Sequence, residues 1–106
     1  MGKLINLTPH PIVVVGEEGE RIIPPSGMVL RLPERVEPAG EVEGIPVVRK
    51  ALDGASALPA MEEGVFYVVS LAVAQAARRP DFLVPDDFIR DGEGRIVGCR
   101  RLAVLT

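Results

Sequence analysis

Uncharged polar side chains, cysteine and aromatic residues are all scarce in this chain of 106 residues. It has one histidine, one asparagine, one glutamine, three serines, two threonines and one tyrosine, and it has no tryptophan. A core without tryptophan must be built mostly from Val, Leu, Ile and Ala. A chain of this length forms one domain around one core, so we expect a single globular domain over residues 1–106.

The low cysteine and histidine content limits the chemistry that the chain can support. Cys99 is the single cysteine, so no internal disulfide can form, and a reducing compartment fits. One histidine and one cysteine cannot supply the protein ligands of a typical zinc site. The acidic residues from Asp81 to Glu93 lack the ligand register of a calcium loop. Neither a Walker A loop nor a dinucleotide fingerprint is present, so we expect no metal and no cofactor.

The charge and hydropathy exclude several classes of partner. The formal charge of −3 and the pI of about 5.1 lack the basic footprint of a nucleic-acid binder. No apolar run reaches the roughly 18 residues of a membrane span, and the first residues lack the apolar region of a signal peptide. We therefore expect a cytoplasmic protein that enters no membrane. Ten arginines against two lysines, together with ten prolines, indicate a thermophilic or high-GC source.

Short apolar runs between turn residues predict a mostly β structure. Ser70 is a good N-cap for a helix over about residues 71–79, which Pro80 ends. Residues 34–43, with their proline and glycine, look irregular, and residues 51–64 are typical of a long loop. The sum is an α+β, mostly β fold of seven to eight short strands with one helix, arranged as a small twisted sheet or an open barrel. The expected strands include residues 3–8, 12–15, 28–32, 45–49 and 65–69.

The scarce polar residues gather near the N-terminus, in Asn6-Leu7-Thr8-Pro9-His10. Alternate side chains of an extended segment share a face, so we expect Asn6, Thr8 and His10 to point the same way. His10 would act as a general base, with Asn6 and Thr8 orienting it or binding a ligand. Alternatively, these side chains satisfy backbone groups at the end of a strand. The sequence leaves both interpretations open.

Other groups are candidates for chemistry or binding. Ser70 follows an apolar strand and opens a helix, as a hydrolase nucleophile does, but the G-x-S-x-G pattern is absent. The N–H groups at that helix start would still suit a small anion. Cys99 and His10 would make a nucleophile and its base, whereas Cys99 also fits as a small buried side chain. The arginine pairs at 78–79 and 100–101 either contact an acidic partner or form surface ion pairs.

Residues 4–11, with the Asn-Leu-Thr-Pro-His motif at their centre, resemble the N-terminus of a family of small bacterial and phage proteins to which no activity is assigned. The resemblance covers most of the chain and implies a phage setting, with roles such as virion accessory protein, regulator or host-factor binder. It carries no mechanism. Similar proteins also have segments like Pro25-Ser26-Gly27, Tyr67-Val68-Val69-Ser70, Arg79-x-Asp81 and Gly94-Arg95-Ile96-Val97-Gly98-Cys99.

From the sequence we expect a small non-catalytic binding or regulatory module. Its partner would be another protein or a small anionic ligand, bound through Asn6, Thr8, His10 and Ser70. Two alternatives stay open. One is a small hydrolase or transferase that uses His10 as its general base. The other is a homo-oligomeric structural or accessory protein joined through exposed strand edges.

Overall fold

The computed structural model describes residues 2–52 and 58–105, and these contain eight strands and one helix. The chain is therefore a mostly β protein of the α+β class, as the sequence predicts. In chain order the elements are β1 (Lys3–Asn6), β2 (Ile12–Gly16), β3 (Gly19–Ile23), β4 (Glu34–Val42), β5 (Ile45–Leu52), β6 (Val65–Val68), α1 (Leu71–Ala76), β7 (Phe82–Arg90) and β8 (Ile96–Val104).

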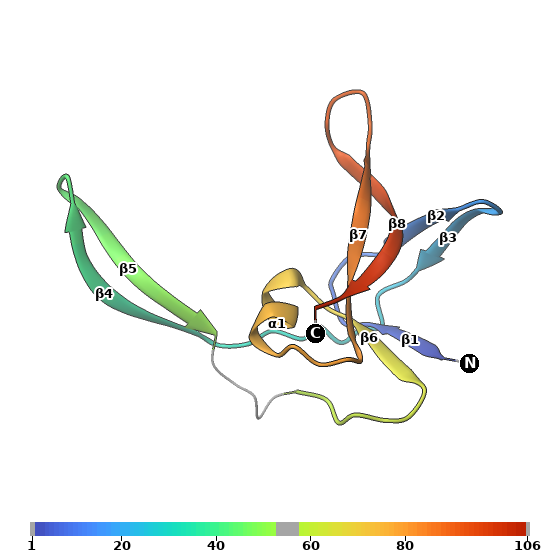
Figure 1. Cartoon of the computed structure of the whole chain (residues 1–106), viewed down its shortest axis with the longest axis horizontal. Helices are drawn as coiled ribbons and strands as arrows, with labels where there is room; N and C mark the ends of the chain where they lie inside the picture. Colours follow the sequence, from blue (N-terminus) through green and yellow to red (C-terminus); the bar gives the residue numbers. More distant parts are fainter. Residues whose placement is uncertain (1, 53–57, 106) are drawn as a thin grey trace.

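Six strands form one sheet in the order β1-β6-β7-β8-β2-β3. The pairs β1–β6, β6–β7 and β2–β8 are parallel, while β7–β8 and β2–β3 are antiparallel hairpins. The sheet nearly closes because the segment after β3 returns to β1, where Asn6 bridges to Pro25 and the Leu30 N–H donates to the Leu7 carbonyl at 2.9 Å. Of the two arrangements left open by the sequence, the protein adopts the open barrel (Figure 1).

The core forms where α1 packs against the strands β6 and β7. The rings of Tyr67 and Phe82 meet edge to face, with their centroids 6.1 Å apart. From α1, Val73 and Ala74 are buried, because small side chains let a short helix approach the sheet closely. The buried cluster consists of Leu7, Tyr67, Val69, Val73, Ala74, Phe82 and Val84.

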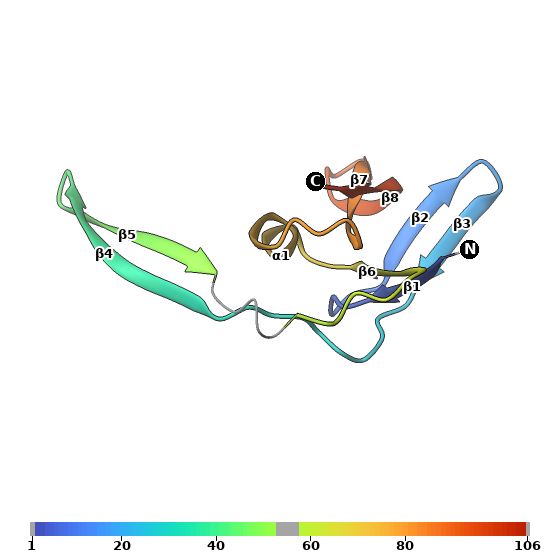
Figure 2. The ribbon, with the colours of Figure 1, turned by 60° about the horizontal axis from the view of Figure 1, so that its bottom comes forward.

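Strands β4 and β5 form a separate two-stranded ribbon, here called the arm (residues 34–52). Figures 1 and 2 show the arm extending away from the barrel in both views. It explains why the radius of gyration is 16.6 Å, against about 13 Å for a compact chain of this length. At its tip, Glu43 and Gly44 both have positive φ, 51° and 79°, as a two-residue type I′ turn requires.

The expectation of an irregular segment at residues 34–43 is wrong, because this stretch is strand β4. Pro38 and Gly40 look like strand breakers, but the pairing with β5 shifts register between Pro38 and Glu41. Gly40 takes a φ of 100° within that irregularity, and glycine does so at little cost. Strand β5 begins at Ile45 as predicted and reaches Leu52. Of the loop expected at residues 51–64, residues 53–57 lie outside the described part of the chain.

Two other element predictions need correction. Residues 28–32 form no strand; Leu30 and Leu32 pack against the core while Met28 stays 71% exposed. Their alternation therefore reflects packing on one side rather than pairing in a sheet. The helix ends at Ala76 instead of near residue 79, because Ala77 leaves helical geometry with a φ of −133°. Arg78 and Arg79 therefore lie beyond the helix.

Candidate functional site

The Asn6 carboxamide is buried and uses its full hydrogen-bonding capacity inside the protein. Its Nδ2 donates to the His10 carbonyl at 2.8 Å and to the Ile23 carbonyl at 3.1 Å. Its Oδ1 accepts from the Thr8 backbone N–H at 2.9 Å and from the Thr8 hydroxyl at 2.7 Å. Two donors and two acceptor positions are all that a carboxamide offers, so Asn6 has nothing left for a ligand.

The expected shared face of Asn6, Thr8 and His10 is wrong, because β1 ends at Asn6 and the chain turns there. Asn6 points into the protein, Thr8 is half-buried and His10 is exposed. The Thr8 hydroxyl lies 3.0 Å from the His10 carbonyl and close to the Asn6 amide oxygen. Asn6 and Thr8 are thus a backbone clamp, as the alternative interpretation predicts, and His10 contributes its carbonyl to that clamp.

Ser70 caps the N-terminus of α1, as its position predicts. Its Oγ accepts from the Val73 N–H at 3.3 Å, which satisfies one of the free amides of the first turn. The helix is six residues long. The hydroxyl is therefore engaged by the backbone of its own helix.

Three of the four candidate side chains nevertheless border one cavity, here called the α1 groove. Its volume is about 390 Å³, and its walls come from the β1–β2 loop, the start of α1, β7 and the end of β8. Most of the lining is apolar, and Leu71 and Phe88 are 55% and 47% exposed there. The lining residues are Thr8, His10, Ile12, Val69, Ser70, Leu71, Val84, Pro85, Asp86, Phe88, Ala103 and Leu105.

Asp86 is the acidic residue of the groove lining, and it is held by an ion pair. The Arg101 Nε donates to Asp86 Oδ2 at 2.7 Å, and this hydrogen bond keeps the pKa of the Asp86 carboxyl below its usual range. Beside it, Arg100 pairs with Asp87 at 3.4 Å. The arginines at 100 and 101 therefore form surface ion pairs, one of the two roles that the sequence left open.

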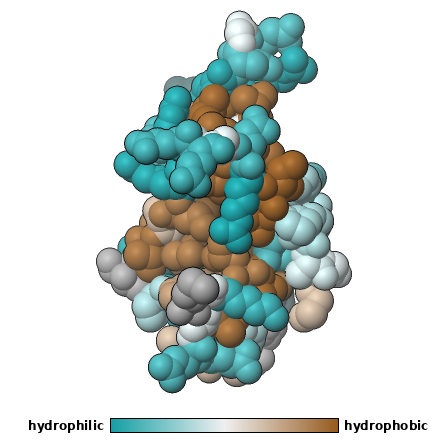
Figure 3. Space-filling model, turned by 90° about the vertical axis from the view of Figure 1, so that its right-hand side faces the viewer, coloured by the Kyte–Doolittle hydropathy of each residue, from teal (hydrophilic) through white to brown (hydrophobic). Residues whose placement is uncertain are grey.

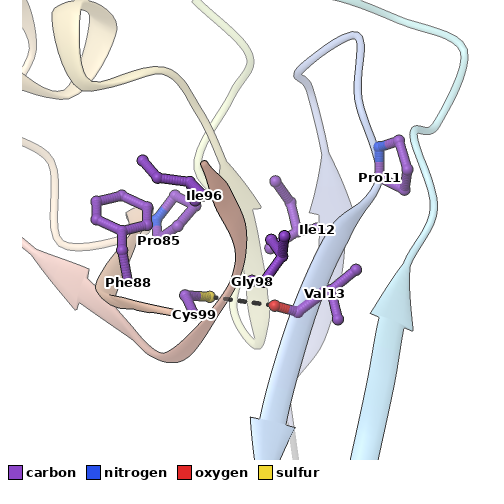
Figure 4. A pocket seen from close by; sticks show the side chains of 9 residues that line it. Pro11, Ile12, Val13, Pro85, Phe88, Ile96, Gly98 and Cys99 are labelled. Atoms are coloured by element: carbon purple, nitrogen blue, oxygen red, sulfur yellow. Dashed lines mark hydrogen bonds between the residues drawn. The ribbon is translucent and has the colours of Figure 1, made fainter. Parts of the chain in front are cut away.

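A second, smaller hollow adjoins the α1 groove between β2 and the β7–β8 hairpin (Figure 4). Its volume is about 170 Å³, and it shares Ile12, Pro85 and Phe88 with the groove. Cys99 borders this hollow but is 1% exposed, with its Sγ 3.5 Å from the Val13 carbonyl. Burial raises the pKa of the Cys99 thiol, which disfavours the thiolate that a nucleophile needs. Of the two interpretations of Cys99, nucleophile or small buried side chain, the structure supports the second. Cys99 also borders a different cavity from His10.

Large apolar side chains are exposed in and around the two cavities. Figure 3, which views the molecule from the right-hand side of Figure 1, shows a broad apolar area below the hydrophilic tip of the β7–β8 hairpin. Contiguous apolar surface of this kind is typical of interaction sites. The exposed large apolar residues on β3, β7 and β8 are Ile22, Phe88, Ile96, Val97 and Val104.

One buried ion pair was missed by the sequence reasoning. The Arg79 guanidinium donates to both Asp81 oxygens, at 2.9 and 2.6 Å, and to the Pro59 carbonyl at 2.7 Å. It also lies over the Phe82 ring, 4.3 Å from the centroid. The hydrogen bonds to Asp81 raise the pKa of Arg79. The Arg-x-Asp spacing in the sequence was the signal that could have predicted this pair. The pair fastens the loop at Pro59 to the core and does not border the α1 groove.

Among residues 2–52 and 58–105, no three His, Cys, Asp or Glu side chains converge as a metal site would need. In the same part of the chain, no helix has the length and apolar character to cross a membrane. No side-chain nitrogen or oxygen buried in this part lacks a hydrogen-bond partner. The buried polar side chains of the described structure are thus fully paired.

Comparisons of the chain with protein families, characterised proteins and solved structures find nothing that matches it. The resemblance to small bacterial and phage proteins stays a prediction.

Proposed function

We propose that the protein is a small, cytoplasmic, non-catalytic binding module whose α1 groove accepts an apolar segment of a partner protein. The observation that carries the proposal is an open cavity whose lining is mostly apolar, with Thr8, His10, Ser70 and Asp86 as its polar residues. Protein interfaces commonly combine an apolar centre with a smaller number of polar groups.

The polar side chains of the region support binding rather than chemistry. The Asn6 carboxamide and the Thr8 hydroxyl hold the β1–β2 loop, and Ser70 caps α1. These groups shape the walls of the groove and are already paired within the chain. Leu71 and Phe88 are the side chains with apolar surface left to bury, and such surface gains about 25 cal/mol per Å² when it leaves water.

A protein segment suits the groove better than a small anionic ligand. The Val73 N–H, one of the donors at the start of α1 that an anion would need, already donates to Ser70 Oγ, and Asp86 places a carboxylate in the lining. An anion would meet that negative charge and an apolar wall. Leucine, isoleucine or aromatic side chains would instead match the lining in polarity.

The proposal is tested with peptides selected from a displayed random library against the wild-type protein, followed by calorimetry. We expect the selected peptides to be rich in large apolar residues and to lose at least about tenfold in affinity for a Leu71→Ser variant, since central apolar contacts dominate binding energy. Met61→Ser is the matched control, because Met61 is 59% exposed but lies outside the groove. Peptides that bind Leu71→Ser as tightly as wild type, or a library that yields no binder, would contradict the proposal.

A hydrolase or transferase based on His10 is the second candidate, because His10 and Asp86 border the same groove. The ion pair with Arg101 keeps Asp86 ionised, and an ionised carboxylate can orient an imidazole. This candidate requires that the wild-type protein turns over an ester, an amide or a substrate with a transferable group, and that this turnover is lost in His10→Gln. The binding module requires no turnover.

A further inference from the structure

The arm is a two-stranded ribbon without a third strand in the described structure. Its strands β4 and β5 pair with each other alone, and the arm extends away from the barrel (Figures 1 and 2). Every residue of β4 is exposed. An isolated two-stranded hairpin is marginally stable in water at best, so an arm of this length needs a surface to pack or pair against.

The arm carries apolar side chains on both faces. Cross-strand neighbours share a face, so Val36, Lys50 and Val48 lie on one side while Val42 and Ile45 lie together near the tip. Val42 and Ile45 are each 64% exposed, and Val48 is 48% exposed. A ribbon meant to stand alone in water would carry polar side chains at these positions.

The outer edge of β5 is the better of the two edges for pairing with another strand. Each strand of the arm contains one proline, Pro38 in β4 and Pro46 in β5, but the bulge lies on β4, where two residues oppose the single residue Val47 of β5. A bulge bends its own strand and blunts that edge against further pairing. Strand β5 has no extra residue, so its edge is the more regular of the two.

Charge is distributed unevenly along the arm. The outer half, residues 37–46, contains three glutamates and no basic residue. The inner half contains Arg35, Arg49 and Lys50 against one acid, Glu34. Two such arms are complementary when they lie antiparallel, because the acidic outer half of each arm then lies beside the basic inner half of the other.

We propose that two copies of this chain pair their arms antiparallel through the β5 edges, around a twofold axis near Val47 and Val48. The product is a four-stranded antiparallel sheet in the order β4-β5-β5-β4, with two copies of the barrel at opposite ends. In this register Arg49 and Lys50 of one copy lie beside Ile45 and Pro46 of the other, so no like charges meet across the axis. This interaction surface is separate from the α1 groove, and the proposal does not depend on the proposed function.

A charge-swap experiment tests the pairing. Sedimentation equilibrium of the wild-type chain, from about 1 μM to 1 mM, should give a mass that rises from 11.4 kDa to twice that value. Glu41→Lys with Glu43→Lys makes the whole arm basic, and Arg49→Glu with Lys50→Glu makes it acidic. Each variant alone should dimerise at least about tenfold more weakly, because like charges face each other.

Mixing the two variants should restore the dimer, because the basic arm of one then meets the acidic arm of the other. The restored heterodimer also shows that neither variant has lost its fold. A matched control is Glu17→Lys with Glu18→Lys, two charge reversals on the β2–β3 turn, and it should dimerise as wild type does.

Several results would overturn the proposal. Wild-type protein that stays at 11.4 kDa over the whole concentration range has no such dimer. Dimers that survive both charge reversals use another surface. Dimers that are lost in Leu71→Ser, and that mixing of the two charge variants does not restore, would place the arm in the α1 groove of the second copy instead.

Discussion

The Asn6 side chain joins three segments that are distant in sequence or direction: the end of β1, the β1–β2 loop and the end of β3. No other residue type offers two donors and two acceptors on so short a side chain. Its position helps to close the barrel, since the neighbouring bridge to Pro25 brings the chain after β3 back to β1. The same clamp holds the β1–β2 loop, which contributes Thr8 and His10 to the lining of the α1 groove.

Asn6→Asp should therefore be strongly destabilising although it changes one group in a side chain of equal size. The carboxylate cannot donate to the His10 and Ile23 carbonyls, and it places an unpaired charge in the interior. We expect a loss of about 3 kcal/mol or more in the free energy of unfolding at neutral pH. Urea denaturation followed by circular dichroism measures it.

Thr8→Ser is the control for the clamp, because serine keeps the hydroxyl that donates to Asn6. This variant should unfold close to the wild-type urea concentration. If Asn6→Asp also unfolds there, the hydrogen bonds of Asn6 do not hold the barrel closed.

At this scale the sequence predicted the N-cap role of Ser70 and offered the clamp as one of two roles for Asn6 and Thr8. The scarcity of polar side chains drew attention to Asn6, Thr8, His10 and Ser70, and three of these border the α1 groove. Their direction was not predictable, because the alternation rule assumes a strand and β1 ends at Asn6. The apolar residues that give the groove its character, Leu71 and Phe88, carried no distinguishing signal, since they resemble ordinary core residues.

At the scale of elements, the β7–β8 hairpin is stabilised by an aspartate in its turn. Asp91 Oδ1 accepts from the backbone N–H groups of Glu93 and Arg95, at 2.9 and 3.0 Å. These hydrogen bonds lower the pKa of the Asp91 carboxyl, and the bond from the Arg95 N–H has the largest effect. A carboxyl whose pKa falls on folding contributes stability above its unfolded pKa of about 3.9, and this contribution is lost as the pH falls through the folded pKa.

Asp91→Asn should accordingly be less stable than wild type at pH 7, because asparagine keeps the amide acceptor but not the ionised carboxylate. The difference in urea midpoint should shrink as the pH falls below about 4. Glu18→Gln, which removes one negative charge from the β2–β3 turn, corrects for the change in net charge. A difference between Asp91→Asn and wild type that is constant from pH 7 to pH 2 would contradict this role for Asp91.

Elements with local signals were predictable, and elements that depend on distant partners were not. The β2–β3 and β7–β8 hairpins and the start of α1 follow from turn and capping residues close in sequence. Strand β4 was missed because its proline and glycine are tolerated only through the register shift against β5. The end of α1 was misplaced because Ala77 already leaves helical geometry, and Arg79, beyond the helix, pairs with Asp81.

At the scale of the molecule, the protein is an open barrel with an apolar groove and a long arm. The strand order β1-β6-β7-β8-β2-β3 joins segments far apart in the chain, so no local pattern predicts it. The groove arises from that order, because it brings the β1–β2 loop beside α1 and the end of β8. The arm is separate from this sheet, since β4 and β5 pair with each other.

The central claim is that the apolar surface of the α1 groove, and not the His10 imidazole, is where the protein works. The most direct measurement is the affinity of one selected groove-binding peptide for wild type, His10→Gln and Leu71→Ser, measured by calorimetry. We predict that His10→Gln binds within about twofold of wild type, whereas Leu71→Ser binds at least about tenfold more weakly. Loss of binding in His10→Gln with full binding in Leu71→Ser would contradict the claim and return the imidazole to the centre of the site.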